Sequence, residues 1–259
     1  MTAVLSAPIV RTRFSAAAIH LLASAGVAAL SALLVFTVWY PAPFARIAGG
    51  TSLFLLLVSV DVVLGPALTL VAASPGKSRP EFRRDLLVIV VLQLAGFAYG
   101  LYTIALARPV YLSFEIDRFR VVTAADIETS ELQKARADLR SLPWLGPKLI
   151  AAVKPESGPD QLRSIELGLA GIDLSMVPFN WRPYDSERAA AWRAAKSTSG
   201  LAARYPQIAA ELSQIATSQG QAPGELRFLP LVSRQASWVI LLAGPDARPV
   251  GYLPVDGFI

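Results

Sequence analysis

Three long apolar runs in the first 107 residues limit what this chain can fold into. The first run lies between Arg13 and Arg46 without a charged residue, and the second has Asp61 as its only charge. The third follows Asp85 and is uncharged up to Arg108. Each run holds at least the roughly 20 apolar residues that span a hydrocarbon core of about 30 Å. We therefore predict three transmembrane helices, near residues 15–38, 51–73 and 86–107.

The first run could instead be a cleaved signal peptide, whose apolar core has about 7–15 residues. This run is longer, and no small-x-small cleavage site is followed by a polar segment. We therefore expect it to be retained as a membrane span. Trp39 and Tyr40 are expected to lie at the membrane–water interface, where Pro41 and Pro43 stop the helix.

Basic residues near the span ends predict the orientation of the chain. Two of them, Arg11 and Arg13, precede the first span. Four more lie in the predicted loop between the second and third spans: Lys77, Arg79, Arg83 and Arg84. Only Arg46 lies in the loop between the first two spans. Because Lys and Arg concentrate on the cytoplasmic side, the N-terminus is predicted to be cytoplasmic. Residues 108–259 then lie across the membrane, which in a bacterium means a periplasmic domain on an inner-membrane protein.

The charge distribution argues against a nucleic-acid-binding protein, although the net charge is +5. Residues 1–107, the predicted membrane domain, hold seven Lys and Arg against three Asp and Glu, whereas residues 108–259 hold seventeen against sixteen. The excess therefore lies beside the membrane, and a nucleic-acid partner would require a basic face on a folded domain. The chain has no cysteine, which excludes disulfides, thiol nucleophiles and thiolate metal ligands.

Asp61 is the strongest candidate for a functional residue in the membrane domain. A charge at the bilayer centre costs about 2.5–3.5 kcal/mol on insertion scales, so Asp61 is not expected to face lipid. Asp61 lies about ten residues, or roughly 15 Å, from the outer end of its predicted helix at about 1.5 Å per residue. The residue at the same depth on the third span is close to Phe97. Gln93 and Tyr99 are therefore candidate hydrogen-bond partners. The carboxylate could serve packing inside the bundle or face an incoming helix or ion, and both interpretations stay open.

Two glycine-containing motifs could receive a partner helix. Gly65 and Pro66 follow Asp61 by about one turn, and proline removes a backbone donor, so we expect a kink and a notch there. Gly96 and Gly100 form a GxxxG spacing in the third span, which lets another helix approach closely. The predicted partner-binding residues are therefore Asp61, Gly65, Pro66, Gly96 and Gly100.

Residues 108–259 are predicted to form a small α+β domain. Alternating apolar residues indicate a hairpin or extended segment from Val110 to Val122 and three final strands, near 226–232, 238–242 and 250–255. Three helices are predicted near 125–139, 185–196 and 206–219. Asp126 is expected to cap the first and Asp185 the second, and Pro206 opens the third. Residues 141–185 are rich in Pro and Gly and are predicted to be loops.

This domain offers little catalytic chemistry. His20, the only histidine, lies in the first span, so no Ser-His or Cys-His pair is available. Glu115 and Asp117 are two residues apart on a predicted strand and share a face, as a catalytic pair would, but such a pair is usually solvated surface. No acid spacing resembles a metal loop, and no glycine loop suits a phosphate. We expect no enzyme activity, cofactor or metal site, and interpret the chain as a membrane-anchored interaction protein.

Three segments carry a resemblance to a known family: VDVVLGPALTL at 60–70, SPGK at 74–77, and DLLVIVVLQLAGFAYGLYTIALARPVYLSFEIDRFRVVTAADI at 85–127. They resemble the type IV pilin accessory protein family of Gram-negative bacteria, continuously from about Ala16 to Ile127 and more thinly beyond. Ser74 stands where that family usually has Asn. The family consists of inner-membrane helpers of the major pilin without agreed catalytic residues. The resemblance therefore implies a helper protein rather than an enzyme.

The resemblance implies a partner with one apolar membrane helix and a periplasmic head, the major type IV pilin. We expect the chain to bind it, together with other pilus assembly proteins, within the lipid bilayer. Such binding would promote or modulate pilin stability, assembly or surface display, as a chaperone does. Two alternatives stay open: a membrane-anchored periplasmic sensor, and a subunit of a transport complex with Asp61 on an ion path.

Overall fold

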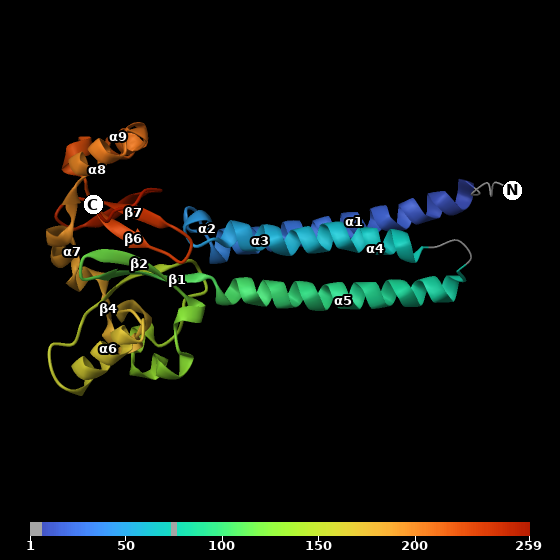
Figure 1. The fold of residues 1–259 in the computed structure, drawn as a ribbon, viewed down its shortest axis with the longest axis horizontal. Coiled ribbons are helices and arrows are strands. Elements are labelled where there is room, and N and C mark those ends of the chain that lie inside the picture. The colour runs from blue at the N-terminus through green and yellow to red at the C-terminus, as the bar shows by residue number, and fades with distance from the viewer. Residues whose placement is uncertain (1–6, 74–76) are drawn as a thin grey trace. The chain divides into compact units, whose positions relative to one another are not determined.

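The computed structural model describes residues 7–73 and 77–259, which form two compact units. The first unit contains the residues up to Val38 together with Gly50–Leu106. The second contains Trp39–Gly49 together with Ala107–Ile259. In Figure 1 the first unit consists of long helices and the second of a sheet with shorter helices. We expected residues 39–49 to belong to the membrane domain, and the structure differs in that segment.

Three helical segments of the described residues are long and apolar enough to cross a membrane: Phe14–Trp39, Gly50–Ala72 and Arg79–Leu106. Their elements are α1 (Ala7–Leu34) with the π turn η1 (Val35–Trp39), α3 (Gly50–Ser59) with the π turn η2 (Val60–Leu64) and α4 (Gly65–Ala72), and α5 (Arg79–Leu106). The first two segments match the predicted spans closely, because the length of an apolar run sets the length of a span.

The third segment begins earlier than predicted, at Arg79 rather than residue 86. Ser78 and Glu81 cap this polar first turn, since the Ser78 N–H donates to Glu81 Oε2 over 2.8 Å and the Glu81 N–H donates to Ser78 Oγ over 3.4 Å. The turn expected at residues 74–76 lies outside the described residues.

The helices of the first unit pack through apolar contacts, and polar side chains also meet between them. α1 lies against α4, and both α3 and α4 lie against α5. The rings of Phe36 and Phe54 meet edge to face with centroids 5.1 Å apart. His20 Nδ1 lies 2.6 Å from Thr69 Oγ1, so each side chain satisfies a polar group of the other in apolar surroundings. We did not anticipate this pair, although two hydrogen-bonding side chains in apolar spans are a signal for one.

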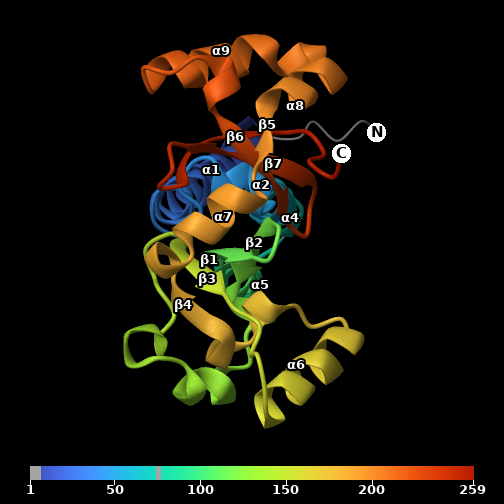
Figure 2. The ribbon, with the colours of Figure 1, turned by 90° about the vertical axis from the view of Figure 1, so that its left-hand side faces the viewer.

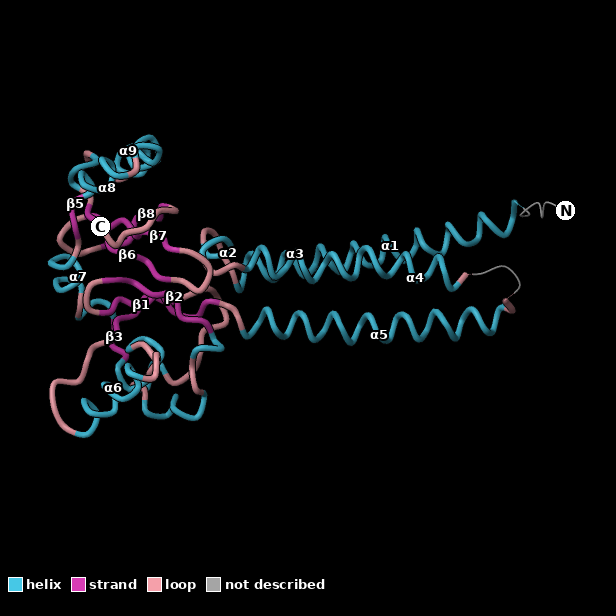
Figure 3. Tube along the Cα trace, in the orientation of Figure 1, coloured by secondary structure: helices cyan, strands magenta, loops and turns pink. Residues whose placement is uncertain are grey.

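The second unit is built on one mixed sheet, whose strands are drawn in magenta in Figure 3. In the described residues they are β1 (Pro109–Glu115), β2 (Arg118–Thr123), β3 (Lys148–Ala152), β4 (Trp181–Pro183), β5 (Lys196–Ser197), β6 (Arg227–Val232), β7 (Ser237–Ala243) and β8 (Arg248–Leu253). The order is β4-β3-β1-β2-β6-β7-β8, with β5 paired to β6. β1 and β2 form a hairpin, β3 runs parallel to β1, and β6 runs parallel to β2. The predicted hairpin and three final strands are confirmed.

The described residues of this unit also form the helices α6 (Pro159–Leu169), α7 (Arg188–Ala194), α8 (Thr198–Arg204) and α9 (Ala209–Ser218), of which α7, α8 and α9 pack on the sheet. Figure 2 shows α8 and α9 beyond β5 and β6, and α6 at the end of the unit that carries β4. Alternate residues of β7 serve two cores, because successive strand side chains point to opposite faces. Ile240 and Leu242 pack with Ala191 of α7, whereas Val239 and Leu241 pack with α8 and α9.

The loop between the first two spans belongs to the core of the second unit. Tyr40 and Ile47 are 0% exposed, and the short helix α2 (Phe44–Ile47) lies within this loop. Phe44 packs edge to face on Tyr252, with ring centroids 5.6 Å apart. Trp39 and Tyr40 are therefore buried against protein of the same unit. Their expected position at the membrane–water interface stays a prediction. Long-range contacts of this kind leave no local pattern in the sequence.

The helix predicted over residues 125–139 is wrong. The chain forms three 3₁₀ turns instead: η3 (Ala124–Asp126), η4 (Thr129–Lys134) and η5 (Ala137–Leu139). Asp126 closes the first of them, since its Oδ2 accepts the N–H and the hydroxyl of Thr123 at 2.8 Å each. Ile127 and Leu139 are drawn into the same buried cluster as Tyr111. Tertiary packing outweighs helix propensity in this segment.

Residues 141–185, predicted to be loops, contain β3, α6 and β4. β3 is held by its parallel pairing with β1, which local sequence does not reveal. α6 begins with Pro159 directly after Gly158, a helix-start signal that we missed. The helix expected over 185–196 is shorter, and comprises the 3₁₀ turn η8 (Tyr184–Ser186) followed by α7. The last predicted helix is confirmed as η9 (Pro206–Ile208) with α9.

Two buried tyrosines should respond oppositely to the same substitution. The Tyr111 hydroxyl is buried without a hydrogen-bond partner among the described residues, so Tyr111→Phe should raise the free energy of unfolding by about 1–2 kcal/mol. The Tyr184 hydroxyl donates to the Ala247 carbonyl over 2.6 Å, so Tyr184→Phe should lower it by a similar amount. Denaturation of the full chain in detergent, followed by tryptophan fluorescence, measures both. If both variants changed the free energy of unfolding in the same direction, the difference in hydrogen bonding between the two hydroxyls would be contradicted.

The buried Tyr111 hydroxyl also predicts a loss of stability at alkaline pH. Burial, with a smaller contribution from Asp138, raises the pKa of Tyr111 to about 12. The unfolded chain then loses this proton near its ordinary pKa of about 10 while the folded chain keeps it, so stability falls as pH rises from about 10 to 12. Tyr111→Phe should therefore lose less stability than the parent chain over this range.

Candidate functional site

The helix around Asp61 changes its winding just before Pro66. Val60–Leu64 form the π turn η2 between α3 and α4. Proline has no N–H and cannot donate to a carbonyl one turn earlier, so the helix must widen or kink in front of it. The π turn therefore accommodates the helix breaker, and it carries Asp61.

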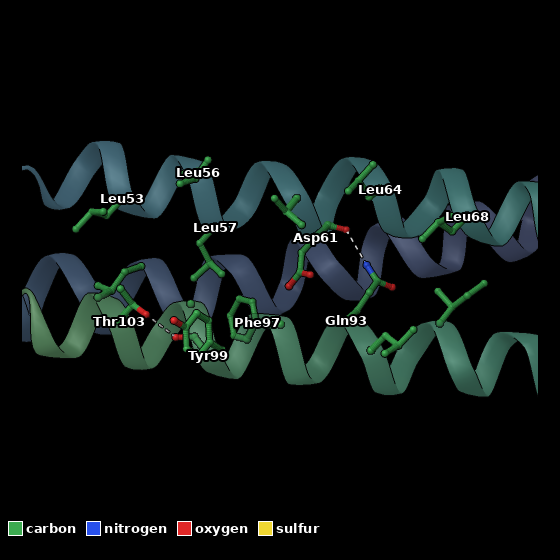
Figure 4. A pocket seen from close by; sticks show the side chains of 16 residues that line it. Leu53, Leu56, Leu57, Asp61, Leu64, Leu68, Gln93, Phe97, Tyr99 and Thr103 are labelled. Atoms are coloured by element: carbon green, nitrogen blue, oxygen red, sulfur yellow. Dashed lines mark hydrogen bonds between the residues drawn. The ribbon is translucent and has the colours of Figure 1, made fainter.

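Gln93 of α5 satisfies the backbone of this turn. Its Nε2 donates to the carbonyl oxygen of Asp61 over 3.3 Å, as the dashed line in Figure 4 shows. Gly65 lies against the same amide, since a Cβ at Gly65 would be 2.2 Å from Gln93 Nε2. The glycine therefore admits Gln93, and a contact within the bundle fills the space at Gly65.

A groove lies between the α3–α4 segment and α5, with a volume of about 440 Å³. We call it the Gly96 groove. Its lining is mostly apolar, with leucine the commonest residue, and the polar members are Asp61, Gln93, Tyr99 and Thr103. Figure 4 shows the Asp61 side chain pointing toward α5. The groove is thus an apolar surface with one carboxylate in it.

The two glycines of the GxxxG spacing both line the Gly96 groove, but they differ in the space around them. A Cβ at Gly96 would meet nothing within 4 Å. A Cβ at Gly100 would lie 2.5 Å from Cδ1 of Leu57, so Gly100 is used for packing inside the bundle. Gly65 and Pro66 line neither this groove nor the next one.

A second groove, of about 280 Å³, lies between α1 and α5 and is lined by His20 and Ser24. We call it the His20 groove. Asp61 and Gln93 line both grooves. The π turn therefore presents one carboxylate to two apolar surfaces of the bundle.

The Asp61 carboxylate forms no hydrogen bond or ion pair with the residues that the structure describes, because Gln93 reaches the backbone carbonyl instead. Gln93 Oε1 is buried and also lacks a partner among them. Tyr99, the other candidate partner, is 73% exposed, and its backbone carbonyl accepts the Thr103 hydroxyl over 3.0 Å. An unpaired acid in an apolar groove can hold a hydrogen-bond donor or cation that an incoming helix carries.

Glu115 and Asp117 do not share a face, so they form no catalytic pair, and Glu115 is not solvated surface. Glu115 ends β1 with its side chain 6% exposed, while Asp117 lies in the following turn with 55% exposure. Glu115 accepts Arg120 Nε over 3.3 Å and the Ser175 N–H over 3.1 Å. It connects the β1–β2 hairpin to the turn η6 (Leu174–Met176) and has a structural role.

Comparisons with known proteins identify the family. A model of the fimbrial assembly protein FimB matches residues 8–49. A fimbrial assembly protein of serogroup I from Dichelobacter nodosus is 38% identical over 229 residues, which are 86% of this chain and 88% of that protein. This chain belongs to the FimB family of fimbrial assembly proteins.

Two further fimbrial assembly proteins from the same organism are similar to this chain. The serogroup E1 protein is 37% identical over 229 residues, and the protein of serogroups C1 and C2 is 45% identical over 117 residues, or 45% of this chain. The alignments to the serogroup I and E1 proteins are longer than either unit alone, so each of them includes residues of both units. No solved structure matches the chain. The family resemblance drawn from the sequence is confirmed.

Proposed function

We propose that this FimB-family protein is an inner-membrane accessory protein for type IV pili that binds the major pilin and promotes or modulates its stability, assembly or display. Membership of a family of fimbrial assembly proteins supports a role in fimbrial assembly. The observation that carries the binding proposal is the unpaired Asp61 carboxylate in the Gly96 groove. The role is one of binding, without a catalytic step.

The proposed topology has three membrane spans with a cytoplasmic N-terminus and a periplasmic second unit. The distribution of basic residues favours this orientation. Trp39–Gly49 and Ala107–Ile259 fold as one unit, which requires both segments to lie on the same side of the membrane. Two spans separate these segments along the chain, α3–α4 and α5, so the requirement is met.

The Gly96 groove suits one transmembrane helix of a pilin. Its leucine side chains supply van der Waals contacts, and the absence of a side chain at Gly96 lets a helix backbone approach. Asp61 fixes the depth of the bound helix, because only one position along the groove offers a carboxylate. The second unit lies on the periplasmic side, where it can contact the pilin head.

Site-specific crosslinking in cells tests whether the pilin helix binds in the Gly96 groove. A photo-reactive residue at Leu92, which is 67% exposed and lines the Gly96 groove, should form an adduct with the major pilin. The matched control is Leu30 on α1, which is 72% exposed and lines neither groove. Adducts at both positions or at neither would contradict a seat in this groove. Adducts with a kinase or a permease subunit would favour the sensor or transport alternative.

Asp61→Asn and Pro66→Ala should both weaken the pilin adduct. Asparagine removes the charge, and alanine restores an N–H that relaxes the π turn and shifts the carboxylate. Interhelical hydrogen bonds in membranes contribute about 1 kcal/mol, which corresponds to roughly fivefold in affinity. Ser59→Ala is the control, because Ser59 donates to Leu56 within its own helix. Undiminished adducts from stable, inserted variants would refute the role of this turn.

A further inference from the structure

An exposed apolar pair stands at one end of the second unit. Trp144 is 65% exposed and Leu145 is 77% exposed, and they are adjacent in the segment between η5 and β3. Two neighbouring, highly exposed apolar side chains of this size are unusual for a surface that faces only water. What surrounds this pair indicates what could cover it.

Trp144 and its neighbours contact residues that directly follow two membrane spans. The Arg108 guanidinium lies over the Trp144 ring, 4.6 Å from its centroid, and Arg108 is two residues beyond Leu106, where α5 ends. Gly146 lies against Pro41, since a Cβ at Gly146 would be 2.9 Å from Pro41 Cγ. Pro41 is in turn two residues beyond Trp39, where the first span ends.

Two residues of chain reach at most about 7 Å, so connectivity alone holds Arg108 and Pro41 close to the span ends. Sheet polarity gives an independent indication. β3 runs parallel to β1, and Lys148 at its start pairs with Tyr111 near the start of β1. The Trp144–Leu145 segment therefore lies at the end of the sheet where β1 begins, directly after α5.

A third span end reaches the same end of the sheet. Gly49, directly before α3, packs against Gln235 in the turn between β6 and β7, with a hypothetical Cβ 2.5 Å from Gln235 Cγ. The neighbouring Arg234 pairs with Asp126, which follows the end of β2. Arg234 is 64% exposed, so this end of the sheet also presents a cation.

We propose that Trp144 and Leu145 insert into the membrane interface and anchor the second unit to the lipid bilayer, with the exposed Arg234 facing lipid phosphates. Tryptophan concentrates at the headgroup level, where an amphipathic ring has both apolar and polar surroundings, and arginine snorkels there. The inference rests on the proposed membrane insertion but not on pilin binding.

Spin labelling of the full chain in vesicles of phosphatidylethanolamine and phosphatidylglycerol tests the anchor. The chain has no cysteine, so Leu145→Cys gives a single labelling site. Ile116→Cys is the matched water control, because Ile116 is 69% exposed in the turn at the opposite end of β1. Leu30→Cys, 72% exposed on α1, is the lipid control. Collision rates with oxygen, which prefers lipid, and with a water-soluble nickel complex locate each label.

We expect the oxygen-to-nickel ratio at position 145 to exceed that at 116 several-fold and to approach that at 30. A water-like ratio at 145 together with a lipid-like ratio at 30 overturns the anchor and leaves the membrane insertion standing. A water-like oxygen-to-nickel ratio at position 30 overturns both the anchor and the proposed membrane insertion. Equal ratios at 145 and 116 overturn a local anchor, and a label at 145 that is shielded only after purified pilin is added assigns this surface to the pilin instead.

Discussion

Arg120→Leu should lower the free energy of unfolding of the second unit by about 3–5 kcal/mol. The Arg120 side chain is 16% exposed and contacts two acids, Glu115 at 3.3 Å and Asp173 at 2.6 Å. Its removal leaves the Glu115 carboxylate, which is 6% exposed, without its cation. A buried charge that loses its partner keeps the cost of leaving water and loses the compensating attraction.

The measurement is denaturation of the full chain in detergent, followed by tryptophan fluorescence. All five tryptophans lie in the second unit, and four of them lie outside the spans, because only Trp39 also ends a span helix. The signal therefore reports chiefly the unfolding of the second unit. Arg118→Leu is the matched control on the same strand, since its pair with Asp117 is 36% and 55% exposed. Exposed pairs contribute about 0–1 kcal/mol. Equal losses from the two variants would contradict a stabilising cluster around Glu115.

A double variant separates the lost pair from lost packing. Glu115→Leu combined with Arg120→Leu removes both charges, and replacement of a buried ion pair by apolar residues is often neutral. We therefore expect the double variant to recover much of the stability that Arg120→Leu alone loses. A double variant as unstable as the single one would assign the effect to the aliphatic part of Arg120.

The sequence predicted those features that depend on local patterns. Apolar runs gave the spans, since a helix in lipid must satisfy its own backbone over the full thickness of the hydrocarbon. Alternation and turn residues gave the β1–β2 hairpin and the β6–β8 meander. Asp61 was recognised because a single acid in an apolar span is conspicuous.

The features that the sequence did not reveal depend on contacts between distant residues. β3 is stabilised by β1, and residues 39–49 are buried by strands more than 60 positions away. The donor supplied by Gln93 was expected at the carboxylate of Asp61, but it reaches the carbonyl that lies one turn before Pro66. That difference leaves the carboxylate unpaired, and depth along a helix could not show it.

Gly96→Leu should strongly reduce the pilin adduct at the Gly96 groove while leaving the bundle folded. A Cβ at this position meets nothing within 4 Å, so a leucine can project into the groove without displacing a neighbour. It would occupy part of the roughly 440 Å³ that the proposed pilin helix needs. We expect binding to weaken at least about tenfold, or about 1.4 kcal/mol, and piliation of the cells to fall with it.

Two other glycines make this prediction specific. Gly26→Leu on α1 adds the same side chain where a Cβ also meets nothing within 4 Å, but it lines neither groove and should leave binding unchanged. Gly65→Leu should destabilise the bundle by about 1–3 kcal/mol, because its Cβ would collide with Gln93. If Gly96→Leu is inserted, stable and binds pilin as the parent chain does, the pilin helix does not lie in this groove. The His20 groove, which shares Asp61, would then be the surface to block next.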